Sequence, residues 1–192
     1  MTRNDQPEDR DGFRFRSGSN VIDLPATLQA RLSPAPRELL ARPEDLRRWL
    51  VSAGIASDEP VVTTDDLSAA RALREAIYVL AGRRGGSAAR AARDVLNAVA
   101  ANPAAVPQLS IAGSMTLTGS TSALLATLAR EAVQLFGSDA IKRIRQCESP
   151  NCTLYFLDTS RRGDRRWCSM LACGNRAKVQ EFRERKGKVR PR

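Results

Sequence analysis

Apolar residues recur at intervals of three and four positions along most of the chain, which is the spacing of amphipathic helices. Capping residues or acidic turns precede these stretches, and glycine or proline follows most of them. Looser alternation predicts a strand or hairpin over residues 109–117, while residues 21–24 fit a strand or a first helical turn. The pattern predicts helices over residues 43–53, 64–81, 87–101, 120–136 and 174–185, and a short one after Ser138.

Composition agrees with a mainly α-helical fold. Alanine occupies 28 of the 192 positions, and aromatic residues make up only 5% of the chain, so the helices should pack through small side chains. Residues 1–19 are polar and charged, and we expect a disordered leader there. Apolar stretches such as residues 122–129 fall far short of the about 20 residues that a membrane span needs. Residues 1–18 contain no apolar core of a secretion signal, so we expect a cytoplasmic protein without a membrane partner.

Charge divides the chain into two parts. Residues 1–138 contain 16 basic and 15 acidic side chains, whereas residues 139–192 contain 15 basic and 6 acidic ones. All four lysines and all four cysteines lie in the second part. This asymmetry predicts a helical domain over residues 20–138 and a basic module over residues 139–192 that meets a polyanion. The alternative is a basic tail whose charge serves solubility alone.

The chain contains no histidine, which excludes Ser-His-Asp and Cys-His catalysis and any histidine-ligated metal. The glycine-rich stretch at residues 82–86 lacks the spacing of a phosphate-binding loop. We therefore expect the protein not to be an enzyme.

The four cysteines form two close pairs. Four residues separate Cys147 from Cys152 and Cys168 from Cys173, and fifteen residues lie between the pairs. Two such pairs around a short segment are typical of a tetrahedral four-cysteine zinc site, in which each pair makes one knuckle. Four thiolates would fill the coordination sphere of one Zn²⁺, so this ion would stabilise the fold and activate no substrate. Disulfides or four unrelated buried thiols are the alternatives, and a reducing compartment disfavours disulfides.

The residues between and after the cysteine pairs predict a zinc-nucleated hairpin followed by a helix, as in treble-clef-like or ribbon-like modules. Residues 154–157 form one expected strand, and Trp167 closes the other. Tyr155 and Phe156 would then point to opposite faces, one into the core of the module and the other to a surface.

Residues 144–185 resemble the CGNR zinc-finger family through FLDTS at residues 156–160, WCSM at 167–170 and CGNRAKV at 173–179. Residues 20–138 are similar to the helical ABATE domain, which precedes this finger in proteins described as stress-induced transcription regulators. That similarity rests on RELL at residues 37–40, DLRRWL at 45–50 and LREA at 73–76. The resemblance implies zinc binding and a regulatory role. The family has Asn-Thr soon after an early Asp-Leu, whereas Asp23-Leu24 here precedes Pro25-Ala26-Thr27, so the role of that asparagine is open in this chain.

Seven basic side chains of the module are the candidate nucleic-acid contacts: Arg161, Arg162, Arg165, Arg166, Arg176, Lys178 and Arg183. The first four flank the turn at Gly163-Asp164, where their guanidinium groups can spread toward phosphates. The other three lie beside an apolar face of the expected helix, whose outward edge carries Glu181 and Glu184. The alternative is a solvated turn whose arginines pair with Asp158 or Asp164.

These observations predict a DNA-binding transcription regulator whose helical domain senses a small-molecule effector or forms a homodimer. A protein-interaction adaptor with a purely structural zinc is the main alternative, because an acidic protein would suit the same charge. RNA binding is a further alternative, since basic hairpins also suit contacts with the shape of RNA. Arg74 and Glu75 are candidate effector contacts, with an ion pair at the helix surface as the other interpretation.

Overall fold

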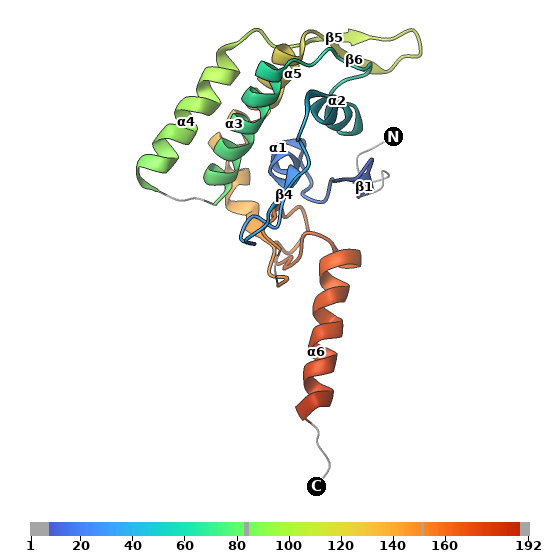
Figure 1. Ribbon diagram of the computed structural model, residues 1–192, viewed down its shortest axis with the longest axis vertical. Coiled ribbons are helices and arrows are strands. Elements are labelled where there is room, and N and C mark those ends of the chain that lie inside the picture. Colours follow the sequence, from blue (N-terminus) through green and yellow to red (C-terminus); the bar gives the residue numbers. More distant parts are fainter. Residues whose placement is uncertain (1–7, 83–84, 151, 189–192) are drawn as a thin grey trace.

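The computed structural model describes residues 8–82, 85–150 and 152–188, which form six α-helices and four antiparallel two-stranded hairpins (Figure 1). The helices are α1 (Asn20–Asp23), α2 (Pro43–Ser52), α3 (Thr64–Ala81), α4 (Gly86–Ala101), α5 (Thr121–Gly137) and α6 (Asn175–Lys188). The hairpins pair β1 (Asp9–Arg10) with β2 (Phe13–Arg14), β3 (Leu28–Gln29) with β4 (Arg37–Glu38), β5 (Val106–Leu109) with β6 (Met115–Thr118), and β7 (Ile144–Gln146) with β8 (Tyr155–Leu157). Short helical turns join them at η2 (Leu24–Thr27), η3 (Asp139–Arg143) and η4 (Met170–Gly174). The mainly α-helical fold expected from the sequence is confirmed.

Local side-chain caps fix where the helices begin. Before α3, Thr63 Oγ1 accepts a hydrogen bond from Asp66 N at 3.1 Å, and Asp66 Oδ2 accepts one from Thr63 N at 2.9 Å. Pro43 opens α2, where its missing N–H would have no partner inside the helix. Ser120 caps α5 by accepting from Ala123 N at 3.2 Å. Because these signals are local, the helices lie where the sequence pattern predicted them.

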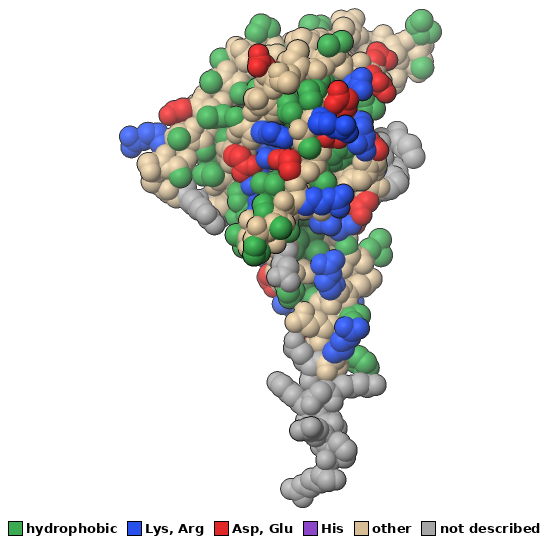
Figure 2. Space-filling view, in the orientation of Figure 1, with side chains coloured by type: hydrophobic (Ala, Val, Ile, Leu, Met, Phe, Trp, Pro, Cys, Tyr) green, Lys and Arg blue, Asp and Glu red, His purple; other side chains and the backbone are tan. Residues whose placement is uncertain are grey.

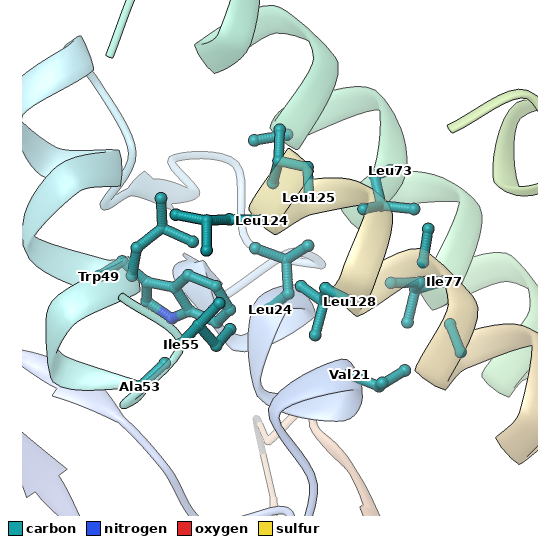
Figure 3. Close-up of a cluster of buried hydrophobic side chains, with 14 of the residues drawn as sticks. Val21, Leu24, Trp49, Ala53, Ile55, Leu73, Ile77, Leu124, Leu125 and Leu128 are labelled. Carbon is teal, nitrogen blue, oxygen red and sulfur yellow. The ribbon is translucent and has the colours of Figure 1, made fainter. Parts of the chain in front are cut away.

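The core forms where α1 and η2 pack against the longer helices. Helices α3, α4 and α5 pack side by side, and α1 contacts both α3 and α5. Figure 3 shows Leu24 of η2 between Trp49 of α2 and Leu128 of α5, all three essentially excluded from solvent. Burying one such side chain stabilises the fold by about 1.5–3 kcal/mol, so this short central segment is a principal source of stability.

The N-terminal segment differs from the predicted disordered leader. Within the described part of it, residues 8–19, Phe13 and Phe15 are 2% and 7% exposed. The Phe15 ring stacks on Trp49 with 6.2 Å between centroids, and the Arg10 guanidinium lies 3.8 Å from the Phe15 centroid. Charged residues that suggested disorder thus shield aromatic anchors from water. Residues 1–7 of the expected leader lie outside the described residues.

The pairing of β7 with β8 corrects the hairpin predicted for the basic module. Ile144 pairs with Leu157 and Gln146 with Tyr155, so the partner strand precedes the first cysteine pair. Trp167, expected to close that second strand, lies in an irregular segment. Strand pairing depends on residues distant in sequence, which is why the apolar pattern alone chose the wrong partner.

Strand β8 belongs to two hydrophobic cores at once. Tyr155 and Phe156 occupy opposite faces as predicted, but both are buried, so neither supplies the expected surface contact. Tyr155 packs into the helical core, with its ring edge-on to Tyr78 at 5.2 Å, whereas Phe156 packs with the cysteines. Leu157 N also donates to Ser17 O at 2.7 Å. Residues on both sides of the boundary predicted at residue 139 therefore contribute to the helical core, since Ile144 and Tyr155 pack into it.

The strand or hairpin expected over residues 109–117 is a hairpin, β5–β6, with Leu109 opposite Met115. None of the described helices combines the length and apolar character needed to cross a membrane. The β5–β6 hairpin and the projecting helix α6 lie at opposite ends of the molecule (Figure 1).

Truncating Tyr155 tests whether the two parts unfold together. Tyr155→Ala should lower the free energy of unfolding by about 3 kcal/mol, because it leaves a cavity in the helical core. Urea unfolding followed by far-ultraviolet circular dichroism would measure the change. Tyr155→Phe keeps the ring and should retain most of the stability. An unchanged midpoint for the helical signal in Tyr155→Ala would mean that residues 20–138 are stable independently.

Candidate metal centre and its basic surface

The first cysteine pair lies in a tight turn after β7. Cys147 N donates to Leu154 O at 2.9 Å, and Cys152 N donates to Ser149 O at 3.0 Å. Cys147 Sγ in turn accepts a hydrogen bond from Cys168 N at 3.4 Å. This backbone donor links the first knuckle to the second and suits a thiolate at Cys147.

In the second pair, Cys168 precedes η4 and Cys173 lies within it, and Ser169 caps this turn. Ser169 Oγ accepts from Ala172 N at 3.2 Å, and its carbonyl accepts from Cys173 N at 3.0 Å. Ser169 is fully buried, and its hydroxyl donates to Glu8 Oε2 at 2.5 Å. The N-terminal segment therefore helps to hold the turn that positions Cys168 and Cys173.

All four predicted ligands come together. Their Sγ atoms lie within 4.8 Å of one another, with 3.9 Å between Cys152 and Cys168 and 3.6 Å between Cys168 and Cys173. Four thiolates bound to a tetrahedral Zn²⁺ at about 2.3 Å stand about 3.8 Å apart. The cysteines are free of disulfides, and their number, kind and spacing fit a metal ion, consistent with zinc.

Crowding of the thiols explains why a cation suits this cluster. Hydrogen bonding with Cys147 is the main cause that raises the pKa of Cys152 to about 12, and burial adds to it. Hydrogen bonds with Cys147 and with Cys152, together with burial, raise the pKa of Cys168 as well. Hydrogen bonds from Cys152 and Cys168 lower the pKa of Cys147 to about 2. One thiolate with protonated neighbours is thus favoured without a metal, and a divalent cation would offset the repulsion when the others ionise.

A buried carboxylate organises the arginine-rich turn. Asp158 is 1% exposed and accepts hydrogen bonds from Ser160 N at 2.9 Å, Ser160 Oγ at 2.6 Å and Arg165 N at 2.9 Å. Burial opposes its ionisation, yet these bonds lower the pKa of Asp158 below its usual value. Arg143 donates to the carbonyls of Asp158 and Ser160 at 2.6 and 2.5 Å. The sequence patterns missed Arg143, because only the folded turn brings these carbonyls to it.

Arg165 points into the module instead of toward solvent. Its Nε donates to Trp167 O at 2.8 Å, and its Nη2 donates to Cys168 O. The guanidinium carbon lies 4.9 Å from the centroid of the Phe156 ring. Arg165 therefore holds the backbone next to a cysteine of the cluster, a role different from the phosphate contact predicted for it.

The other predicted nucleic-acid contacts lie at the surface. Arg162 is at the tip of the turn, 3.2 Å from a carboxylate oxygen of Asp164. Arg166 donates to Glu148 Oε2 at 2.6 Å and lies over the Trp167 ring at 4.9 Å. Figure 2 shows basic side chains along the narrow part of the molecule formed by α6. The exposed candidates are Arg161, Arg162, Arg166, Arg176, Lys178 and Arg183. Their contact with nucleic acid stays a prediction.

One side of α6 faces the first knuckle. A shallow groove of about 170 Å³ lies between Glu148, Pro150, Arg166 and Trp167 on one side and Ala177, Gln180 and Glu181 on the other. Glu181 was expected on the outward edge, but it lines this inner groove. The hydrogen bond with Glu148 is the main cause that raises the pKa of Arg166, and the charge of Glu181 in this groove adds to it. By helical spacing Val179 and Phe182, 49% and 52% exposed, lie on the opposite side of α6. We call that side the outer face.

The candidate effector contacts, Arg74 and Glu75, form an internal ion-pair network. Arg74 is 4% exposed and donates to the two oxygens of Glu38 at 2.6 and 2.8 Å and to Glu75 Oε1 at 2.8 Å. Arg31 Nη1 donates to Glu75 Oε2 at 2.6 Å. The ion pair expected as the alternative is present, but with Arg74 buried it is internal and not at the helix surface, and the network ties the β3–β4 hairpin to α3.

A four-cysteine metal centre on a hairpin-and-helix module, packed against a helical domain, defines a zinc-finger protein with a helical N-terminal partner domain. Residues 18–139 match the family model ABATE, described as "Putative stress-induced transcription regulator", and residues 143–186 match that of the CGNR zinc finger. The first match covers more than half of the chain, which therefore belongs to the ABATE family. Both resemblances inferred from the motifs are confirmed in the same order. No curated protein matches the chain.

Replacing one ligand tests the metal centre. Cys168→Ser should abolish the binding of one zinc ion per chain, because a neutral hydroxyl is a poor ligand and folding of the module is coupled to the metal. Native mass spectrometry would measure the bound metal. Ser149→Ala is the matched control, since this buried hydroxyl has no partner among the described residues. Wild-type protein that folds but contains no metal would contradict the zinc assignment.

Removing the Arg165 side chain tests its support of the cluster. Arg165→Ala should weaken zinc affinity by about 10- to 100-fold, because groups that hold metal ligands in place have effects of that size. Competition with a chromogenic chelator would measure the affinity. Arg162→Ala removes the same charge from an 85% exposed side chain and should leave the affinity unchanged. Equal affinities in both variants would show that the inward bonds are dispensable.

Proposed function

We propose that the protein is a DNA-binding transcription regulator in which one Zn²⁺, bound by Cys147, Cys152, Cys168 and Cys173, fixes the geometry of a basic binding module. With four thiolate ligands the ion has no open position for a substrate, so its role is structural and the protein is not an enzyme. The helical domain would sense an effector or form a homodimer. Each of these roles extends beyond the family assignment.

The outer face of α6 is the observation that carries the proposal. Its apolar centre is bordered by Arg176 and Arg183 on one side and by Lys178 on the other, all exposed. Glu181 lies on the inner side beside Arg166, so its carboxylate is turned away from this face. A polyanion approaching the outer face would therefore meet cations without facing that carboxylate.

The size of α6 suits contact with duplex DNA. Fourteen residues make a helix about 21 Å long, and the helix projects from the body of the molecule (Figure 1). A major groove about 12 Å wide admits a helix of this kind. Arg161 and Arg162, at the tip of the neighbouring turn, would then contact phosphates and set orientation without reading sequence.

The adaptor alternative has one specific observation in its favour. Apolar side chains are exposed along η4 and α6, at 46% for Met170, 79% for Leu171, 49% for Val179 and 52% for Phe182. An exposed apolar row with a basic border also suits an amphipathic acidic partner. On DNA, the apolar row could contact only thymine methyl groups, which offer less apolar surface than such a protein partner. The salt dependence described next separates the two functions.

The proposal predicts the salt dependence of DNA binding. The logarithm of the association constant should fall linearly with the logarithm of salt concentration, and Arg176→Ala/Arg183→Ala should flatten the slope by about 1.8, since each phosphate contact contributes about 0.9. Fluorescence anisotropy of a labelled duplex, titrated at several salt concentrations, would measure the slope. Binding to all sequences should weaken alike, because phosphate contacts do not read bases.

The matched control removes the same charge from the helical domain. Arg90→Ala/Arg93→Ala alters two exposed arginines of α4 and should leave the slope unchanged. Equal losses in both double variants would mean that binding reflects net charge. An unchanged slope in Arg176→Ala/Arg183→Ala would remove the outer face from DNA binding and favour the adaptor function.

A further inference from the structure

A pocket of about 530 Å³ lies between the helical domain and the metal centre. One wall comes from the loop between β3 and β4, with Ala30, Leu32, Ser33 and Pro34. The other wall comes from the first knuckle, with Cys152 and Thr153. The pocket is much larger than a water molecule needs, and part of its lining is apolar, so a small organic molecule suits it better than water alone.

The wall opposite Cys152 is held in place by the helical domain. Arg31, near the start of the loop, pairs with Glu75 at 2.6 Å, and its guanidinium carbon lies 4.1 Å from the centroid of the Tyr78 ring. Ser33 N donates to Ala30 O at 2.8 Å and closes the turn, in which Ala30 has φ of 50°. A loop anchored by this ion pair, in which the Arg31 side chain is 8% exposed, keeps the pocket formed in the absence of a ligand.

Access to the pocket distinguishes Cys152 from the other three cysteines. Cys147, Cys168 and Cys173 are 6%, 0% and 4% exposed, whereas Cys152 is partly exposed. Among the four, only Cys152 lines the pocket. As ligands of one proposed Zn²⁺ all four cysteines would have the same chemical form, so access is what distinguishes them. Cys152 has that access through the pocket.

We propose that Cys152 is a reactive site for soft carbon electrophiles of the α,β-unsaturated carbonyl class, which enter through this pocket. The Cys152 sulfur would add to the β-carbon of the electrophile and form an S–C bond. The π electron pair of the C=C bond would move to the α-carbon, which then takes a proton from water and leaves hydroxide. The product is a neutral thioether, so no oxidant or leaving group is needed.

Such a reaction would change the metal centre itself. A thioether lacks the negative charge of the thiolate it replaces, so three anionic ligands would remain for the cation. Loss of the metal would loosen the first knuckle, which leads into β8, from the second knuckle, which contains η4. The inference rests on the zinc occupancy proposed above and is independent of DNA binding.

The test maps the reaction of each cysteine in the zinc-loaded full-length chain. N-ethylmaleimide would be added in limiting amount, and peptide mass spectrometry at successive times would identify the modified residue. Cys152 should react about tenfold faster than each other cysteine, because it is the partly exposed residue of the four. Zinc release, followed with 4-(2-pyridylazo)resorcinol, should rise together with Cys152 modification.

A variant that keeps all four ligands tests the route. Leu32→Trp should slow the modification of Cys152 severalfold by filling the pocket entrance, and Leu109→Trp, at a distant residue of equal exposure, should leave it unchanged. Earlier reaction at another cysteine, reaction only after the metal is stripped, or a wild-type rate in Leu32→Trp would each overturn the proposal. Native mass spectrometry before reagent is added distinguishes these outcomes from failure of the metal centre, and none of them depends on DNA.

Discussion

Alternation of side chains along β8 joins the two halves of the molecule. Successive side chains of a strand point to opposite faces, and the two faces of β8 pack into different hydrophobic cores. Tyr155 completes the packing around Tyr78 of α3, and Phe156 fills the space beside the cysteine cluster. A strand three residues long has few hydrogen bonds of its own, so its position depends on both cores together. Anything that displaces the knuckles therefore disturbs the helical domain, and the reverse holds as well.

The sequence predicted those elements whose causes are local. Helices α3 and α5 follow capping residues and α2 begins at a proline, and all of α2 to α5 have apolar faces within their own spans, so periodicity located them. The N-terminal segment and the β7–β8 pairing were missed because their stability comes from distant partners. Phe15 is ordered by Trp49, and Ile144 by Leu157. Composition reports the average character of a segment, whereas a single buried ring can order it.

At the metal centre, the four ligands could be predicted from the sequence, but the contacts around them could not. Spacing identified the four cysteines because thiolate coordination restricts which residues can meet. It did not reveal that Arg165 turns inward, since that direction depends on the carbonyls of Trp167 and Cys168. Nor did helical spacing alone orient α6. It placed Glu181 on one edge correctly, but only the groove beside Trp167 shows that this edge is the inner one.

The direction of α6 follows from the metal centre more than from packing. Cys173 lies two residues before the start of α6 at Asn175, and the described residues that line the inner groove end at Glu181. An isolated helix of fourteen residues is marginal in water, so α6 needs an anchor at its start. A cation shared by Cys173 and the first knuckle would supply that anchor, because it would fix η4 relative to β7 and β8. Any binding at the outer face would then require the metal, whatever the partner. A small molecule that reacts with Cys152 in its pocket would disturb the metal centre, and through it the position of α6, without contacting α6.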